Sequence, residues 1–327
     1  MLLARAPLRI SFMGGGSDLP SFSNKEFGQV ISCTINKYIY LVINQPFDQR
    51  IRLSYSKTEV VDSPKEIKHP LFRETLIEIG PESNLEIGSF ADVPDTGTGL
   101  GSSSSFTVAL VAGLKKFQNL SILPDEIAAL ACKIEIDRCG DPIGKQDQYA
   151  SAIGGFNKYC FNMDGSVSID KDILSQESLL NFQNSLYLIY LGFSRKSNEI
   201  LLRQSDLLNS NNEVFEKTRQ IRDLVDHMIL AIKSMDMQLV GEMLEDSWQI
   251  KKQLSEGISN IQIDECFQLL KSWGASGGKL LGAGGGGFLL MVVPSKNQIN
   301  FEAKLEKSHL RRVQFTFENS GVETFEH

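Results

Sequence analysis

The sequence predicts a two-domain protein of the α+β class. Its 327 residues exceed what a single hydrophobic core usually holds. Both halves of the chain mix strand patterns with helix patterns, which is typical of α+β and α/β proteins. A polar stretch at residues 175–184 separates the halves, and we therefore expect one domain over residues 1–178 and a second over residues 179–327.

The N-terminal half begins with strands and continues with helices. Runs rich in β-branched and aromatic residues predict strands at residues 7–13 and 38–43. Apolar residues at helical spacing start at Phe106 and again after Pro124, so we expect a helix at each place. Shorter strands are expected at residues 83–90 and 154–162.

The C-terminal half opens with a predicted strand at residues 185–192 and is largely helical after it. A helix is indicated by the apolar spacing that starts at Ile263. Strands are expected within residues 279–294 and 311–317, with a helix between them. One long amphipathic helix is predicted by a stripe made of Ile221, Leu224, Val225, Met228, Ile229 and Ile232.

Composition and charge exclude several classes of protein. Apolar residues make up 42% and charged residues 22%, as in ordinary globular proteins. The net charge of −7 argues against broad binding of nucleic acid or of an anionic membrane. No apolar run approaches the ~20 residues that would span a bilayer, and the first residues lack the pattern of a signal peptide. The five scattered cysteines contain no C-x-x-C pair and indicate free thiols in a reducing compartment, so we expect a cytoplasmic protein.

Three glycine clusters lie beside predicted strands, at residues 13–18, 97–105 and 282–287. The middle cluster, GTGLGSSSS, leads into a helix. The N-terminus of a helix presents unpaired N–H groups and a partial positive charge, and glycines before it let an anion approach the backbone closely. Serine hydroxyls add hydrogen bonds, and a hydroxyl oxygen can ligate Mg²⁺. This cluster therefore predicts a phosphate-binding loop.

Two better-known phosphate motifs do not fit. In GASGGKL, residues 274–280, the spacing is one residue short of a Walker A loop, and Leu280 replaces the hydroxyl residue. The run GAGGGG is followed by the strand-like FLLMVV rather than by a helix, which excludes a dinucleotide fingerprint. We expect residues 282–287 to form a tight strand–loop–strand turn whose backbone lies against a ligand or another loop.

Three segments together resemble the motifs of the GHMP kinases, the superfamily of galactokinase, homoserine kinase, mevalonate kinase and phosphomevalonate kinase. They are RAPLRISFMGGGSDLP (5–20), GLGSSSS (99–105) and KLLGAGGGGFLL (279–290). They occur in the order of the family and span nearly the whole chain. The resemblance implies an enzyme that uses ATP and Mg²⁺. It also implies an N-terminal α/β domain with a left-handed βαβ crossover and a ferredoxin-like C-terminal domain, with the nucleotide between them.

The resemblance implies roles for the middle loop and for a following helix. In several members of the family, a glutamate that binds magnesium precedes a glycine turn by five residues. Glu135 has the same spacing to Gly140. Ser103 and Glu135 are therefore the expected metal ligands. The residues expected to bind ATP are Gly97, Gly99, Leu100, Gly101, Ser102, Ser103 and Ser104.

The resemblance also implies the catalytic residues. Asp147, in GKQDQ, matches the aspartate that acts as the base, and Asp141 is a rival for this role because one residue is inserted after the glycine turn. Arg9 occupies the cationic position of the first motif. It would lower the pKa of the attacking hydroxyl or steady Asp147 as an anion.

The acceptor is expected to lie near the first motif. Asp18 aligns with an aspartate that holds sugar hydroxyls in galactokinase-like enzymes, and a carboxylate suits that task because it accepts two hydrogen bonds. The sequence GGGSD stands where those enzymes have GEHTD, so the pocket is expected to be more open. The further residues expected to bind substrate here are Gly15, Gly16, Ser17, Gly284 and Gly285.

Three further segments are similar to the branch of sugar-1-kinases that contains heptose 7-phosphate kinases and fucokinase-type enzymes. They are GGGSDLP, GKQDQYASAIGG and GFSRKSNEIL. An acceptor that already carries a phosphate needs a second cationic site. Arg195, Lys196 and Ser197 begin a predicted helix and are the expected phosphate cradle, with Lys279 and Arg73 as alternatives.

The expected activity is ATP-dependent phosphorylation of the anomeric hydroxyl of D-glycero-D-manno-heptose 7-phosphate to the 1,7-bisphosphate. The product would enter the biosynthesis of nucleotide-activated heptose for surface polysaccharide. Two alternatives stay open: another GHMP small-molecule kinase of the fucose, galactose or mevalonate type, and a catalytically inactive ligand sensor. The expected partners are the sugar phosphate and ATP, with neither nucleic acid nor membrane, and a homodimer is left open.

Overall fold

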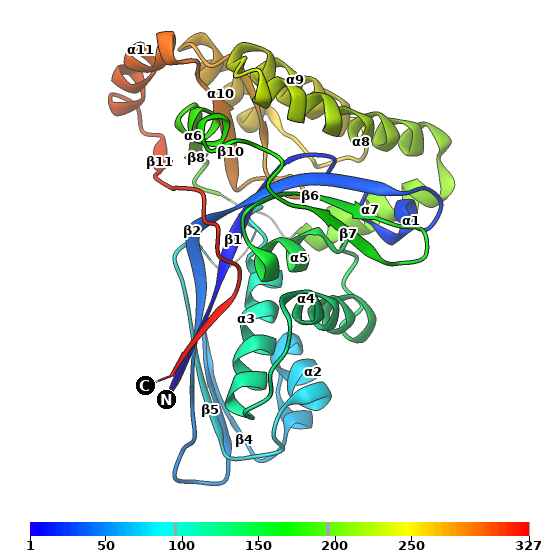
Figure 1. Cartoon of the computed structure of the whole chain (residues 1–327), viewed down its shortest axis with the longest axis vertical. Coiled ribbons are helices and arrows are strands. Elements are labelled where there is room, and N and C mark those ends of the chain that lie inside the picture. The colour runs from blue at the N-terminus through cyan, green and yellow to red at the C-terminus, as the bar shows by residue number, and fades with distance from the viewer. Residues whose placement is uncertain (95–96, 194–196, 327) are drawn as a thin grey trace.

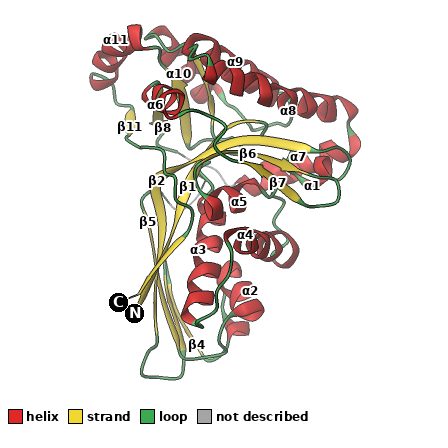
Figure 2. Cartoon of the chain, viewed as in Figure 1, coloured by secondary structure: helices red, strands yellow, loops and turns green. Residues whose placement is uncertain are grey.

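The computed structural model describes residues 1–94, 97–193 and 197–326. The chain forms two lobes, which are stacked along the long axis in Figure 1. Long strands and the helices α2, α3 and α4 make up the lower lobe, and the helices α8 to α11 lie at the far end of the upper lobe (Figure 2). Both lobes therefore combine helices with a sheet, as the sequence predicts.

The larger sheet contains eight strands within the described residues. Its main path runs in the order β12-β1-β2-β5-β3-β4, while β6 pairs with β2 and β7 pairs with β6. Strand β2 is long enough to serve both parts, since its first half pairs with β6 and its second half with β5. The strands are β1 (Leu2–Met13), β2 (Gly28–Asn44), β3 (Ile51–Ser54), β4 (Thr58–Val61), β5 (Leu85–Ala91), β6 (Phe156–Phe161), β7 (Val167–Asp170) and β12 (Glu323–Glu326).

The smaller sheet belongs to the upper lobe and is antiparallel, in the order β11-β8-β10-β9. Its central strand β10 is fully buried along its length, which explains the uninterrupted apolar run in the sequence. The strands are β8 (Leu186–Tyr190), β9 (Gly277–Leu280), β10 (Phe288–Val292) and β11 (Arg311–Val313).

Helices cover both sheets. Helix α3 begins at Ser102, so the serines of the middle glycine cluster form its first turn and the apolar spacing from Phe106 continues it. The helices of the first half are α1 (Pro20–Ser23), α2 (Pro70–Ile79), α3 (Ser102–Phe117), α4 (Pro124–Cys132), α5 (Gln146–Ile153) and α6 (Gln176–Asn184), with a 3₁₀ turn at Pro64–Glu66 and a π-helical turn at Lys133–Arg138. Those of the second half are α7 (Ser197–Ser210), α8 (Asn212–Lys233), α9 (Met237–Lys251), α10 (Ile261–Ser272) and α11 (Ser295–Glu306).

The two lobes share buried side chains. One hydrophobic cluster joins Phe12 of β1 and Ile31 of β2 to Val225 of α8 and Leu244 of α9. The expected division between residues 178 and 179 falls inside α6, and it stays a prediction. The end of the chain returns to the lower lobe, where β12 pairs with β1 beside the N-terminus (Figure 1).

Among the described helices, none combines the length and the apolar character needed to cross a membrane.

Candidate active site

Two adjoining pockets lie where the glycine clusters meet. They share the lining residues Arg9, Ile143, Asp147, Leu201, Gly282 and Ala283. The first, the loop pocket, is lined in addition by Gly97, Thr98, Gly99, Gly101, Ser102, Ser103, Ser104, Asp141 and Asn198. The second, the inner pocket, is lined in addition by Ser11, Gly15, Gly16, Asp18, Leu19, Gly144, Gln146, Gln204, Lys251 and Lys279.

The second and third glycine clusters touch through their backbones. Gly99 has a φ of +79°, and a Cβ there would lie 2.4 Å from the carbonyl oxygen of Leu281. A Cβ at Gly282 would in turn lie 2.3 Å from the Cα of Gly99. The turn at residues 282–287 therefore lies against another loop, which is one of the two arrangements expected from the sequence.

Three of the four serines after Gly101 have different partners. Gly101, not a serine, is the N-cap of α3, and it has a left-handed φ of +77°. Ser103 Oγ donates to Glu135 Oε1 at 3.1 Å, and Ser105 Oγ donates to the carbonyl of Pro7 at 2.9 Å. Ser102 Oγ lies 3.2 Å from the hydroxyl of Thr98. The first-turn N–H groups of α3, which have no acceptor within the helix, are thus free to bind an anion in the loop pocket.

Glu135 lies behind Ser103 in the π-helical turn that follows α4, an irregularity that is frequent at functional sites. Its side chain is fully buried, and Gln148 Nε2 donates to its second oxygen. Burial raises the pKa of Glu135 to about 7, so a cation bound nearby would restore its charge. A carboxylate and a hydroxyl are oxygen donors of the kind that Mg²⁺ prefers, and of the two Ser103 lines the loop pocket while Glu135 lies behind it. The structure thus brings the two expected metal ligands into contact.

Arg9 and Asp147 form a bidentate ion pair on the wall that the two pockets share. Arg9 Nε donates to Asp147 Oδ1 and Nη2 donates to Oδ2, each at 2.7 Å, while Nη1 donates to the carbonyl of Gly99 at 2.6 Å. The Arg9 side chain is buried and that of Asp147 is 26% exposed. This geometry fixes the carboxylate with one edge open to the pockets.

Asp141, the rival of Asp147, lies elsewhere. It lines only the loop pocket, and its Oδ1 accepts a hydrogen bond from Asn198 Nδ2 at 3.2 Å. Burial raises the pKa of Asp141 from its ordinary value. Only Asp147 of the two thus reaches the wall that both pockets share.

Asp18 also lines the inner pocket. It accepts hydrogen bonds from the backbone N–H of Gly16 at 3.1 Å and of Gln146 at 3.3 Å. Burial, and secondly the charge of Asp147, raise the pKa of Asp18. A Cβ at Gly144 would lie 2.0 Å from Asp18 Oδ2, so only glycine permits this approach.

The other expected substrate residues divide into three groups. Gly15 and Gly16 line the inner pocket, whereas Ser17 is fully buried and its Oγ donates to the carbonyl of Gly14 at 2.7 Å. Gly284 and Gly285 pack against Ile258, to whose carbonyl the N–H of Gly285 donates at 3.0 Å. From that glycine cluster, Gly282 and Ala283 are the residues that line the pockets.

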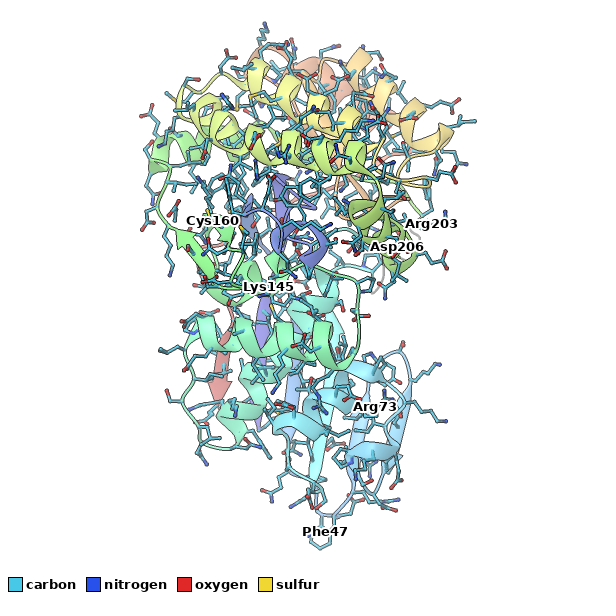
Figure 3. The ribbon with its side chains drawn as sticks, turned by 90° about the vertical axis from the view of Figure 1, so that its right-hand side faces the viewer. Phe47, Arg73, Lys145, Cys160, Arg203 and Asp206 are labelled. Carbon is cyan, nitrogen blue, oxygen red and sulfur yellow. The ribbon has the colours of Figure 1, made fainter. Side chains whose placement is uncertain are left out.

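The expected phosphate cradle cannot be placed in the same way. Arg195 and Lys196 lie outside the described residues, and Ser197 is the first residue of α7. Arg73, one alternative, is on α2 in the lower lobe, and its guanidinium bonds Glu74 and the carbonyl of Ile67. Figure 3 shows Arg73 well below Arg203 and Asp206, which mark α7.

The residues of the inner pocket that sequence reasoning missed include Lys251 at the end of α9 and Gln204 on α7, and it named Lys279 only as an alternative. Burial, and secondly the charge of Arg9, lower the pKa of Lys251 to about 8. Burial lowers the pKa of Lys279 well below its ordinary value, with Lys251 and Arg9 as further causes. The position of Lys279 at the start of the third glycine motif could have indicated it from the sequence. Nothing in the sequence indicates Lys251 and Gln204, because only tertiary packing brings their helices to the pocket.

Comparisons with known proteins agree with this geometry. The family model of the GHMP kinases N terminal domain matches residues 67–155, and that of the GHMP kinases C terminal matches residues 228–310. A D-glycero-alpha-D-manno-heptose 7-phosphate kinase from Campylobacter jejuni is 27% identical over 98% of this chain and 98% of its own length. A mevalonate kinase from Saccharolobus solfataricus is 24% identical over 98% of each chain.

Solved structures show the same fold. A D-glycero-D-manno-heptose 1-phosphate kinase from Bacteroides thetaiotaomicron superimposes with a TM-score of 0.81 at 23% identity, over 100% of this chain and 99% of that one. A galactokinase from Lactococcus lactis gives a TM-score of 0.77 at 16% identity, over 98% and 95%. These likenesses confirm the predicted fold class.

The two family models match one after the other along the chain, and the first of them contains both the glycine loop at residues 97–105 and Asp147. The glycine clusters are among the segments whose resemblance predicted an ATP-dependent kinase. The chain belongs to the GHMP kinase family and is an ATP-dependent kinase.

Proposed function

We propose that this kinase transfers the γ-phosphoryl group of ATP to the anomeric hydroxyl of D-glycero-D-manno-heptose 7-phosphate. The observation that carries the proposal is the Arg9–Asp147 pair on the wall between a phosphate-binding loop and an inner pocket that holds a carboxylate and two lysines. The similarity to a heptose 7-phosphate kinase over nearly the whole chain supports this choice of acceptor.

In this proposal the loop pocket holds the nucleotide. The first-turn N–H groups of α3 bind its phosphates, and the positive φ angles of Gly99 and Gly101 shape the loop that leads into this turn. Ser103 and Glu135 would hold Mg²⁺, which supplies charge neutralisation to phosphoryl transfer when it is bound.

The acceptor occupies the inner pocket with its anomeric hydroxyl at Asp147. Asp147 orients this hydroxyl and takes its proton as the new P–O bond forms and the bond to ADP breaks. Arg9 keeps Asp147 in position through two hydrogen bonds of 2.7 Å. Asp18, which lines the same pocket, accepts hydrogen bonds from sugar hydroxyls.

The product, a 1,7-bisphosphate, would supply nucleotide-activated heptose for surface polysaccharide, a pathway that would place the enzyme in the cytoplasm. A nucleotidyl transfer step needs the phosphate on the anomeric carbon. It would follow removal of the phosphate at position 7.

A panel of acceptors tests the proposal. The purified enzyme is assayed with ATP and Mg²⁺ on heptose 7-phosphate, the free heptose, fucose, galactose and mevalonate, and the product is identified by ³¹P NMR. We expect the highest kcat/KM for heptose 7-phosphate and a new anomeric phosphate signal. A higher value for a free sugar or mevalonate would contradict the proposed acceptor, and a lack of turnover on all acceptors would favour the inactive sensor.

A further inference from the structure

Three hydrogen-bond donors converge in the inner pocket from separate parts of the fold. Lys251 ends α9, Lys279 belongs to β9, and Gln204 lies on α7. Because these elements come from distant positions in the sequence, local structure does not account for their meeting.

The donors of these side chains outnumber the acceptors that the described residues offer them. Lys279 Nζ donates to the carbonyl of Phe12 at 3.0 Å, and Lys251 Nζ donates to the carbonyl of Gly282. Each ammonium carries three protons, so two remain on each. Gln204 Nε2 is buried in a residue that is 2% exposed, and it has no acceptor among the described residues.

Placing these cations together costs free energy in the absence of an anion. Lys279 is 5% exposed, and the pocket holds three basic side chains, Arg9, Lys251 and Lys279, against two carboxylates, Asp18 and Asp147, of which Asp147 is already paired with Arg9. A buried ammonium is unfavourable unless it is paired, and the carbonyl oxygens that it contacts do not neutralise it. A dianionic group in the pocket would supply both the missing charge and the missing acceptors.

We propose that Lys251, Lys279 and Gln204 form the receptor for the phosphate that the acceptor sugar already carries. This rests on the proposed function, in which the acceptor is a sugar phosphate. The tetrahedral oxygens of a phosphate ester can accept hydrogen bonds from three directions, and the three donors come from three elements.

The direction of α7 favours this receptor over the basic segment at residues 194–197. Asn198 lines the loop pocket, Leu201 lines both pockets, and Gln204 lines the inner pocket. Residues three apart lie on one helix face, and six residues span roughly 9 Å of helix. The first turn of α7 is therefore at the loop pocket, and the helix borders the inner pocket from Leu201 to Gln204, which is further along it.

The test compares one sugar with and without its phosphate. The ratio of kcat/KM for heptose 7-phosphate to kcat/KM for the free heptose is measured in the wild type, Lys279→Met and Lys251→Met. We expect each substitution to lower this ratio by about 10- to 150-fold, the usual worth of a charge-assisted hydrogen bond. Gln204→Leu should lower it less, since an amide carries no charge.

Matched controls keep the test specific. Lys252→Met removes the neighbouring lysine, which pairs with Asp264 outside the pocket, and should leave the ratio unchanged. The melting temperature of Lys279→Met should not fall, because methionine fills a similar volume without a buried charge.

The outcomes separate the two proposals. A wild type that prefers a free sugar contradicts the proposed function. A wild type that prefers the phosphate ester, together with lysine variants that keep this preference, overturns the receptor alone. An equal loss on both acceptors also overturns it, because the lysines would then act on the transferred phosphoryl group. Loss of the preference in Arg195→Ala, but not in the lysine variants, would place the site at residues 194–197.

Discussion

Replacing Asp147 with asparagine keeps the size of the side chain and removes its charge and its ability to take a proton. In the wild type the carboxylate accepts two hydrogen bonds from Arg9 and one from Gln146 Nε2 at 2.9 Å. An asparagine retains one acceptor oxygen and turns an NH₂ group toward one of these donors. The variant therefore loses the proposed base and half of its bidentate contact with Arg9.

The two losses should appear in different measurements. General-base assistance is typically worth about 10²–10⁴-fold, so kcat should fall at least about 10²-fold. The lost ionic hydrogen bond is worth about 1.5 kcal/mol, the lower end of the usual range, because the Asp147 side chain is 26% exposed and solvent screens it. Arg9 keeps its contact with the carbonyl of Gly99, so the melting temperature should drop by only a few degrees.

The assay is single-turnover phosphoryl transfer, with ATP binding and the melting temperature measured on the same samples. Asp141→Asn is the matched control, since Asp141 lies in the same segment but does not contact Arg9. We expect this control to lose much less activity. If Asp141→Asn is the inactive variant and Asp147→Asn keeps its rate, the alignment of the catalytic segment and the roles given to Arg9 and Asp147 are wrong.

Three further predictions address the metal, the loops and the pH dependence. Glu135→Gln should lower kcat and raise the Mg²⁺ concentration needed for half-maximal activity, and wild-type kinetics at limiting Mg²⁺ would exclude Glu135 as a ligand. Gly282→Ala should raise the KM for ATP, because its Cβ would meet Gly99, whereas Gly192→Ala, at a similar φ of +81° with nothing near, should not; equal KM values would show that the loop contact is dispensable. Lys251, with a pKa of about 8, should make kcat/KM for the sugar phosphate fall as the pH rises through about 8. Since the unfolded chain binds its proton up to about pH 10.5, the free energy of unfolding should rise between these pH values, and both effects should be absent from Lys251→Met.

Much of the site could be predicted because its residues belong to short motifs. The sequence paired Ser103 with Glu135 and Arg9 with Asp147, and the structure brings each pair into contact. Their roles remain predictions. Lys251 and Gln204 could not be found, because each is one polar residue on a helix, and nothing local indicates which pocket that helix will border.

The fold shows the same division. Strands and helices with strong periodicity were predicted, and α3 begins at the serines of the cluster that was expected to lead into a helix. The hydrogen bonds that Ser103 and Ser105 form are to distant partners, Glu135 and Pro7, and they supply the reason for a helical first turn of serines. Strand β12 also escaped prediction, since its four residues become a strand only by pairing with β1.

That pairing has a consequence for how the protein is made. Leu2 and Glu326 lie opposite each other in the sheet, so β1 leaves the ribosome long before the strand that pairs with its outer edge. At typical synthesis rates of about 5–20 residues per second, that edge of β1 waits for roughly 16–65 s. An unpaired edge is a template for wrong partners, including another nascent chain on the same message. Chaperone dependence should therefore respond to delays in translating the codons of β12, although the residues at risk belong to β1.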